Sequence, residues 1–349
     1  MSISDDAIIL GIESTCDETA CALVAGGRRV LANVVATQIE LHTRFGGVVP
    51  EIASRAHLEA VNSVLEEALS RAGVPVEQIA AVAVANRPGL IGSLLIGLMA
   101  AKTLAWAWGK PLIGVNHIHA HAYSPALDGE PIAYPAVAMV ASGGHTSLYL
   151  VKAPTELELL GSTTDDAAGE AFDKVASILG LGYPGGPVID QAARTGNPKA
   201  VDFPRPLLKG QSLDFSFSGL KTSVLYHVRG VPGAVREGVE KGTKLTEQEL
   251  RDVAASFQAA LVDTLRIKMR RAALATGAKS LIIGGGVSAN SALRLAVEEL
   301  GRKHDLSVRL PALKYCVDNA AMTAGLAWHL LNAGVTDTLE LEATATVRV

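Results

Sequence analysis

The sequence predicts an α/β protein of two domains, and three observations support this prediction. The chain has 349 residues, about the length of two average domains. Hydrophobic residues make up 49% of the chain and charged residues 19%, which indicates a compact protein with a sizeable core and excludes a disordered or fibrous chain. Short apolar runs of strand length alternate with longer segments of helical spacing, as in α/β folds.

Charge and cysteine content restrict the class of function. The net charge is −4, so nucleic acid could be bound only by a local basic patch or with a partner subunit. The three cysteines are too few for a disulfide framework and form no CxxC pair, which favours a reducing compartment. The N-terminus lacks a basic signal-peptide region, and the longest apolar run, residues 90–101, ends at Lys102. We therefore predict a soluble, cytoplasmic protein without a membrane span, in which this run is a buried core helix.

The first half of the chain is expected to alternate strands and helices. Apolar runs predict the strands, and apolar residues at helical spacing before Gly73 predict the first long helix. The expected strands are residues 7–13, 21–24, 30–35, 79–85 and 111–115, and the expected helices are residues 51–73 and 91–106.

The second half continues this alternation. The expected strands are residues 136–141, 147–151 and 281–283, and the expected helices are residues 165–180, 291–303 and 320–331. A capping box at residues 246–249 predicts the start of one more helix. Residues 182–187 are interpreted as a rigid turn and residues 230–245 as a mobile loop. Residues 214–222 form a small-residue segment with one cation, for which a plain strand and turn is the alternative.

Acidic and hydroxyl side chains crowd the turn after the first strand. Residues 11–19 read Gly-Ile-Glu-Ser-Thr-Cys-Asp-Glu-Thr, and the chain then returns as a second strand. Such a hairpin turn can face a phosphate group or a metal ion. An ordinary hairpin with a polar turn is the alternative, and the sequence leaves both open.

Three histidines follow the strand at residues 111–115. If the chain turns helical at His117, then His117 and His121 lie on one face and could bind one divalent metal ion, whereas His119 lies about 200° round the axis from His117. Three unrelated surface or core histidines are the alternative. Asp318 precedes the last expected helix, where it could cap that helix or give a carboxylate to the metal, and spacing does not decide between these roles.

A glycine-rich turn, residues 284–286, lies between an expected strand and an expected helix and is followed by Asn290. Bare amides in such a turn can bind an adenosine or phosphate group. The turn alone is a weak signal, and Asn290 at the helix start strengthens it.

Taken together, these motifs resemble those of the bacterial tRNA N6-adenosine threonylcarbamoyltransferases, the TsaD-type family. The similarity runs in order from about residue 7 to about residue 334, and agreement in this many stretches argues against chance. The matching stretches are residues 11–19, 46–51, 116–121, 142–146, 165–174, 183–187, 214–222 and 284–290.

The resemblance implies a fold, a reaction and partners. The fold would be the two-lobed type shared by actin, heat-shock chaperone ATPases and sugar kinases, with a ribonuclease-H-like α/β unit in each lobe and a central cleft. Residues 1–136 and 318–349 would form the first lobe and residues 137–317 the second. The reaction would transfer a threonylcarbamoyl group from threonylcarbamoyl-AMP to N6 of adenosine 37 in tRNAs that read ANN codons. Besides tRNA, the implied partners are a smaller paralogous TsaB-type subunit and a TsaE-type ATPase subunit.

The resemblance also assigns residues to the site. His117, His121 and Asp318 would bind one divalent metal ion per subunit, with Fe²⁺ favoured and Zn²⁺ as the alternative. The adenylate site would be lined by Val140, Ala141, Ser142, Gly143, Gly144, Asp173, Gly186, Asp190 and Asn290. Glu13 is a candidate catalytic residue, with a polar or proton-accepting role near the reacting centre.

Three features depart from the family pattern. Arg87 stands where glycine is usual, and it would carry a steric cost if that position required a positive φ. His119 replaces an acidic residue, and residues 345–349 lack the usual Arg-Pro-rich tail.

Three other functions compete with the transferase. A metalloprotease would need glutamate directly after His117, where this chain has Ile118. A sugar or carboxylate kinase would not need the histidine pair, and a non-catalytic nucleotide-binding scaffold of the same complex would lack both these histidines and the turn at residues 142–146. We therefore favour a catalytic subunit.

Six basic residues are candidates for tRNA phosphate contacts, with solvated surface as the alternative. They are Arg205, Lys209, Arg266, Lys268, Arg270 and Arg271.

Overall fold

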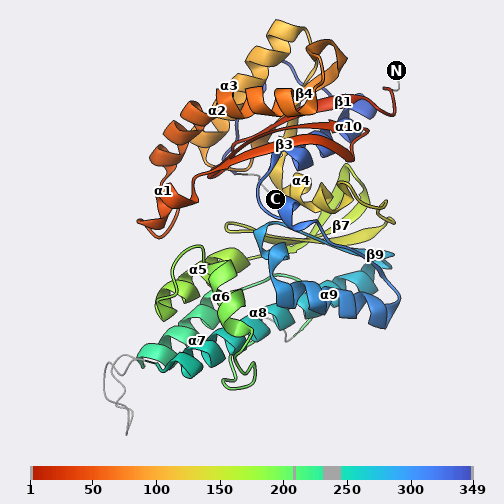
Figure 1. Ribbon diagram of the computed structural model, residues 1–349. Coiled ribbons are helices and arrows are strands. Elements are labelled where there is room, and N and C mark those ends of the chain that lie inside the picture. The colour runs from red at the N-terminus through yellow and green to blue at the C-terminus, as the bar shows by residue number, and fades with distance from the viewer. Residues whose placement is uncertain (1–2, 207–209, 231–244, 347–349) are drawn as a thin grey trace. The chain divides into compact units, whose positions relative to one another are not determined.

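The chain forms two compact units. The computed structural model describes residues 3–206, 210–230 and 245–346. The first unit comprises Met1–Ile132, Val151–Leu157 and Arg309–Val349, and the second comprises Ala133–Leu150 and Glu158–Val308. The chain contains two five-stranded sheets with helices packed on them (Figure 1). The lobe boundaries expected from the sequence stay a prediction.

The sheet of the first unit places three strand ends at one edge. Its strand order is β3-β2-β1-β4-β5. The strands are β1 (Ile8–Glu13), β2 (Glu18–Ala25), β3 (Arg29–Thr37), β4 (Ile79–Arg87) and β5 (Leu112–Asn116). β1 pairs antiparallel with β2 and parallel with β4, and β4 pairs parallel with β5. Because β1, β4 and β5 run in the same direction, their carboxyl ends bring Glu13, Arg87 and Asn116 to the same edge.

Helices cover both faces of this first sheet. α2 (Pro50–Ala72) and α3 (Ile91–Trp108) pack on β2 and β4, and their apolar side chains join Leu10 and Ile12 in the core. α10 (Ala320–Asn332) packs on β1 from the face to which Gly11 would point a side chain. A Cβ atom on Gly11 would lie 2.5 Å from the carbonyl oxygen of Ala320, so only glycine permits this approach. The short helices of this unit are α1 (Ile39–Thr43), α4 (His117–Tyr123), η1 (Val76–Gln78), η2 (Ser124–Ala126) and η4 (Leu313–Tyr315).

The apolar helix α3 is only partly buried, contrary to the prediction of a buried core helix. Leu94, Leu98 and Ala101 face the core, whereas Ile91, Leu95, Met99 and Trp106 are exposed, Trp106 by 73%. By length and composition alone, α3 is apolar enough to cross a membrane, a test that the core helix of a soluble protein also passes. Its packing on α2 and β4 explains one apolar face, and its exposed side chains form a second one, the α3 stripe (Ile91, Leu95, Met99 and Trp106).

The second sheet has the strand order β10-β9-β6-β7-β8. β6 and β9 are parallel, with Val140 beside Gly284, so both strands end at the glycine-containing segments that follow them. The strands are β6 (Ala136–Ala141), β7 (Thr146–Ala153), β8 (Glu156–Ser162), β9 (Ser280–Gly284) and β10 (Ser307–Arg309). The helices are α5 (Ala168–Leu179), α6 (Gly185–Ala193), α7 (Ser218–Arg229), α8 (Glu247–Thr276), η3 (Gly286–Ala289) and α9 (Ser291–His304).

The predicted elements are largely confirmed, with α7 as the main omission. No helix was expected in residues 214–222, for which a plain strand and turn was the alternative considered, but α7 begins at Ser218. The carboxylate of Asp165, more than fifty residues earlier, accepts hydrogen bonds from the backbone N–H groups of Phe217 and Ser218 and from the Ser216 and Ser218 hydroxyls. A cap supplied from so far away leaves no local signal.

Smaller differences concern element boundaries. The sequence expected a helix from residue 165, but α5 begins at Ala168, so Asp166 precedes it, and α6 already begins within the expected turn at Gly185. β8 and β10 were not expected. The capping box is confirmed, because Glu249 N–H donates to Thr246 Oγ1 and Thr246 N–H donates to Glu249. Of the expected mobile loop, residues 231–244 lie outside the described residues, as does Lys209.

Neither Arg87 nor the last described segment strains the first unit. Arg87 closes β4 and is not among the described non-glycine residues with positive φ, so the steric cost considered for it does not arise. The C-terminal segment lies against the sheet. Asp337 N–H donates to the Leu112 carbonyl, the Asp337 carboxylate accepts from Gly114 N–H at 2.7 Å, and Gly89 N–H donates to Ala345.

Candidate active site

Three side chains of the first unit converge at the strand edge that bears Glu13. β5 ends at Asn116, whose side chain caps α4 by accepting from the N–H groups of Ile118 and His119. The chain therefore turns helical at His117, as expected, and His117 and His121 lie on one face with ring centroids 4.6 Å apart. Asp318 Oδ1 lies 2.9 Å from His121 Nε2 and 3.5 Å from His117 Nε2. The predicted triad is thus brought together.

Asn319, which the sequence analysis overlooked, resolves the two possible roles of Asp318. The Asn319 side chain accepts from Met322 N–H at 3.1 Å and caps α10. The same side chain donates to the carbonyl groups of Val317 and Tyr315, which fixes the loop before the helix. Asp318 is therefore not needed as a cap, and its carboxylate faces the two histidines. An asparagine directly before an apolar helix was the available signal.

The triad fits a divalent metal ion. The three ligand atoms lie within 4.8 Å of one another. Two atoms that bind one ion at about 2.1 Å are themselves about 3.0–3.4 Å apart in octahedral or tetrahedral geometry, close to the two distances measured to Asp318. Two imidazoles and one carboxylate are also a common ligand set that leaves coordination positions open.

Negative charge surrounds this triad and favours a cation. Glu18 is almost completely buried, and burial together with the charges of Asp318 and Asp17 raises its pKa well above the ordinary value. Burial lowers the pKa of His117, but the charges of Glu13 and Asp318 outweigh burial and raise that pKa to about 9. These charges favour the interpretation that the polar turn at residues 14–19 faces a metal ion, over that of an ordinary hairpin turn.

Glu13 has no exposed surface and makes several hydrogen bonds. Its Oε1 accepts from Thr15 N–H at 2.9 Å, and its Oε2 lies 3.2 Å from both His117 Nδ1 and Thr323 Oγ1. Thr15 Oγ1 also lies 3.2 Å from His117 Nδ1. Thr323 was not singled out from the sequence, because its partner comes from another element, whereas Thr15 lies in the polar turn that was considered as a phosphate- or metal-facing site.

His119 lies on another face of α4 and is not part of the triad. Burial, and then the positive charge of Arg87, lower the pKa of His119 to about 4. The two side-chain departures from the family pattern, Arg87 and His119, are therefore close enough to interact electrostatically.

In the second unit, two of the predicted adenylate-site residues contact each other. Asn290 is the N-cap of α9, and its side-chain N–H group lies 3.3 Å from Asp190 Oδ1 and 2.7 Å from Gln258 Oε1. Asp190 Oδ1 also accepts from Ser291 Oγ at 2.7 Å. Gln258 and Ser291 extend the predicted set, and their own sequence context contained no signal.

The remaining predicted residues lie on glycine-containing segments of the same unit. Val140 and Ala141 are buried in β6, so only their backbone could reach a ligand. Side chains added to Gly143, Gly144 or Gly186 would meet nothing within 4 Å, so these backbones border open space. Ser142 O accepts from Gly169 N–H, and Asp173 Oδ1 accepts from Gly185 N–H at 2.7 Å. Within the unit, these contacts tie the segment after β6 to α5, and α5 to α6.

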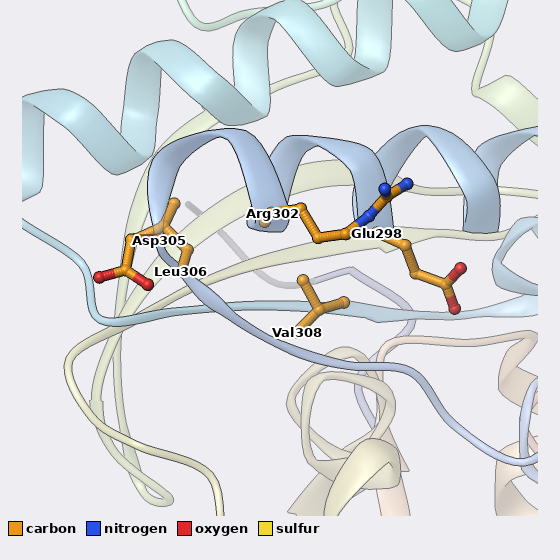
Figure 2. Close-up of a pocket in the computed structure, with 6 residues that line it drawn as sticks. Glu298, Arg302, Asp305, Leu306 and Val308 are labelled. Atoms are coloured by element: carbon orange, nitrogen blue, oxygen red, sulfur yellow. The ribbon is translucent and has the colours of Figure 1, made fainter.

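A pocket on the second unit lies apart from this chemistry. Figure 2 shows it between α9 and the segment around β10, with a volume of about 480 Å³. Glu298, Arg302, Asp305, Leu306 and Val308 line it together with Gly301, and none of these is a predicted site residue.

Solved structures of low sequence identity share the fold of this chain. HypF of T. kodakarensis aligns with 94% of this chain and 48% of its own chain, with a TM-score of 0.61 and 13% identity. Component A of the (R)-2-hydroxyglutaryl-CoA dehydratase of Acidaminococcus fermentans aligns with 93% of this chain and 99% of its own, with a TM-score of 0.50 and 15% identity. The fold is that of the actin, chaperone-ATPase and sugar-kinase class, as expected from the sequence.

Sequence comparison identifies the family within this class. The family model described as TsaD, tRNA N6-adenosine threonylcarbamoyltransferase, matches residues 29–325. The protein of that name from Symbiobacterium thermophilum is 51% identical over 338 residues, covering 97% of this chain and 96% of the relative. A second, from Anaeromyxobacter dehalogenans strain 2CP-1, is 50% identical over 327 residues, covering 93% and 95%. The chain belongs to the tRNA N6-adenosine threonylcarbamoyltransferase family, which confirms the resemblance found in its motifs.

Proposed function

We propose that this protein transfers a threonylcarbamoyl group from threonylcarbamoyl-AMP to N6 of adenosine 37 in tRNAs that read ANN codons. The observation that carries the proposal is the convergence of His117, His121 and Asp318 in a chain that belongs to this family. In the reaction, N6 attacks the carbamoyl carbon and gives up one proton, the bond from that carbon to the phosphate oxygen breaks, and AMP leaves.

The triad would hold one divalent ion per subunit, Fe²⁺ by preference or Zn²⁺. When bound, such an ion supplies Lewis-acid polarisation of a carbonyl oxygen. His117 and His121 would bind it through Nε2 and Asp318 through its carboxylate, since these are the atoms that converge.

The residues of the second unit would bind the adenylate. The open backbone at Gly143, Gly144 and Gly186 supports this role, because a ligand could approach it without meeting side chains. Asp190, held in place by Asn290 and Ser291, would accept hydrogen bonds from ribose hydroxyls or the threonyl ammonium group. Asp173 would do the same, and Val140 to Ser142 would contribute backbone groups.

The partners are also part of the proposal. A chain with a net charge of −4 has no overall basic field for tRNA, which supports action together with a smaller paralogous subunit and an ATPase subunit. We place this action in the cytoplasm. The exposed α3 stripe supports the presence of a protein partner, since four large apolar side chains lie there at helical spacing.

Individual basic residues give the tRNA proposal little support. Lys268 has no exposed surface and donates to the Ser212 carbonyl, which contradicts the phosphate contact considered for it. Arg205 and Arg266 form ion pairs with Asp263.

Nucleoside mass spectrometry tests the proposed reaction. Unmodified ANN-reading tRNA would be incubated with metal-loaded protein, its partners and threonylcarbamoyl-AMP. We expect threonylcarbamoyladenosine from the unmutated protein and from the control Arg302→Ala, which alters the pocket in Figure 2. His117→Ala should lower its yield at least about tenfold, because a metal ligand is lost.

Each alternative has a distinct result. If His117→Ala modifies tRNA as well as the unmutated protein does, the proposed reaction stands, but the role of His117 as a metal ligand is wrong. No modification by metal-loaded protein with active partners would favour the non-catalytic scaffold.

A further inference from the structure

We propose that Glu13 is a positioning residue, which holds the His117 imidazole so that Nε2 is available to a metal ion. This inference rests on the metal site of the proposed function but does not depend on the transferase reaction. The prediction from the sequence gave Glu13 a polar or proton-accepting role, and its contacts point to an action through His117.

The first argument is that both oxygens of Glu13 are already engaged inside the protein. Oε1 accepts from Thr15 N–H, and Oε2 faces His117 Nδ1 and Thr323 Oγ1 at 3.2 Å each. The side chain has no exposed surface. A carboxylate in this setting orients a neighbour rather than meeting a substrate.

The second argument concerns the two nitrogen atoms of His117. A carboxylate oxygen can only accept, so Nδ1 must donate its hydrogen toward Glu13. In neutral imidazole the other nitrogen, Nε2, then carries the lone pair, and it is Nε2 that lies near Asp318. Carboxylates behind a histidine ligand fix the ring and increase its basicity in this way.

The third argument is the contrast between the two histidines. His121 Nδ1 is buried and has no hydrogen-bond partner among the described residues, whereas His117 Nδ1 lies near both Glu13 and Thr15. Polar contacts at Nδ1 therefore fix the ring of His117, whereas the His121 ring has a polar contact only at Nε2, with Asp318. Loss of Glu13 should weaken one ligand selectively.

Zn²⁺ affinity, measured by competition with a chromophoric chelator on the full chain, tests this inference without any tRNA. Glu13→Ala should weaken Zn²⁺ binding about 10–100-fold, the usual effect of losing such a partner. Glu13→Gln retains the shape of the side chain and one acceptor oxygen, so this variant should lose less Zn²⁺ affinity than Glu13→Ala. The control Asp166→Asn removes a mostly buried, ion-paired carboxylate from the other unit and should leave Zn²⁺ affinity unchanged.

A double-mutant cycle separates positioning from general electrostatics. In the His117→Ala background, Glu13→Ala should have little further effect on Zn²⁺ affinity, because its only route to the metal is gone. An equal loss in both backgrounds, or unaltered affinity of Glu13→Ala, would overturn the inference. If Glu13→Ala does not fold, the same cycle with Glu13→Gln decides, together with the ¹⁵N chemical shifts of His117. These shifts, recorded on the Zn²⁺-loaded protein so that the ring is neutral, should show hydrogen on Nδ1 in the unmutated protein and a mixture of tautomers in the variant.

Discussion

Two adjacent residues at the start of α10 divide two tasks between them. Asn319 caps the helix and fastens the preceding loop, and Asp318 faces the histidines. The sequence predicted His117 and His121 as a pair because both lie on one short helix. It left the role of Asp318 open, because Asp318 and His121 are 197 residues apart and no local pattern records such a contact. Thr323 escaped prediction for the same reason.

Substitution of Asn319 separates capping from loop fixation. Asn319→Ala should lower the free energy of unfolding by about 1–3 kcal/mol, since a cap is lost and the carbonyl groups of Tyr315 and Val317, the first buried and the second partly buried, lose a donor. Asn319→Ser can still cap α10 but is too short to hold the loop. We therefore expect it to retain more stability than Asn319→Ala while losing Zn²⁺ affinity to a similar extent.

Chemical denaturation and chelator competition measure the two effects. Equal stability of Asn319→Ala and the unmutated protein would contradict the capping role. Undiminished Zn²⁺ affinity in both variants would show that the loop does not depend on Asn319.

At the scale of elements, the close contact between β1 and α10 connects the sheet to the metal ligands. Helices with local caps or glycine stops, such as α2 and α8, were predicted well because their signals lie within a few residues. α7 was missed because Asp165 caps it from a distance. The packing of α10 on Gly11 was likewise beyond sequence reasoning, since a glycine in a strand does not reveal which helix approaches it.

A side chain at Gly11 should disturb both stability and the site. In Gly11→Ala, the new Cβ would lie 2.5 Å from Ala320 O and 2.8 Å from Ala324 N, so the backbone of α10 must move. We expect a loss of about 1–3 kcal/mol in unfolding free energy, as for other overpacked cores, and weaker Zn²⁺ binding.

Gly47→Ala is the matched control, because a Cβ there would meet nothing within 4 Å. It should change stability by less than about 0.5 kcal/mol. Unfolding curves of the three proteins in urea would reveal the difference, and equal midpoints would argue against close packing at Gly11.

At the scale of the whole molecule, neutral histidines that are buried or partly buried make stability depend on pH. His57 has no exposed surface and bonds to Thr19 and to the Cys16 carbonyl, and burial lowers its pKa below the ordinary value. Burial, and then the charge of Arg28, lower the pKa of His329 to about 4. The unfolded chain binds protons at these histidines near pH 6.5, whereas the folded protein does not.

We therefore expect the metal-free protein to lose stability as the pH falls below about 6.5, with the His329 contribution to this loss continuing to about pH 4. His329→Gln, which keeps a polar partner for Tyr123, should show a shallower decline. Thermal melting temperatures between pH 7.5 and 4.5 would test this, and identical slopes for both proteins would exclude His329 as a contributor.

The C-terminal segment protects the edge of the first sheet from pairing with other chains. β5 is the last strand of its sheet, and an uncovered last strand offers its backbone groups to any other extended chain. Asp337 forms hydrogen bonds with the Leu112 carbonyl and the Gly114 N–H group of β5, and Leu341 packs beside Gly114. The protein thus blocks this border with its own tail, and self-association or aggregation through β5 would first require the tail to detach.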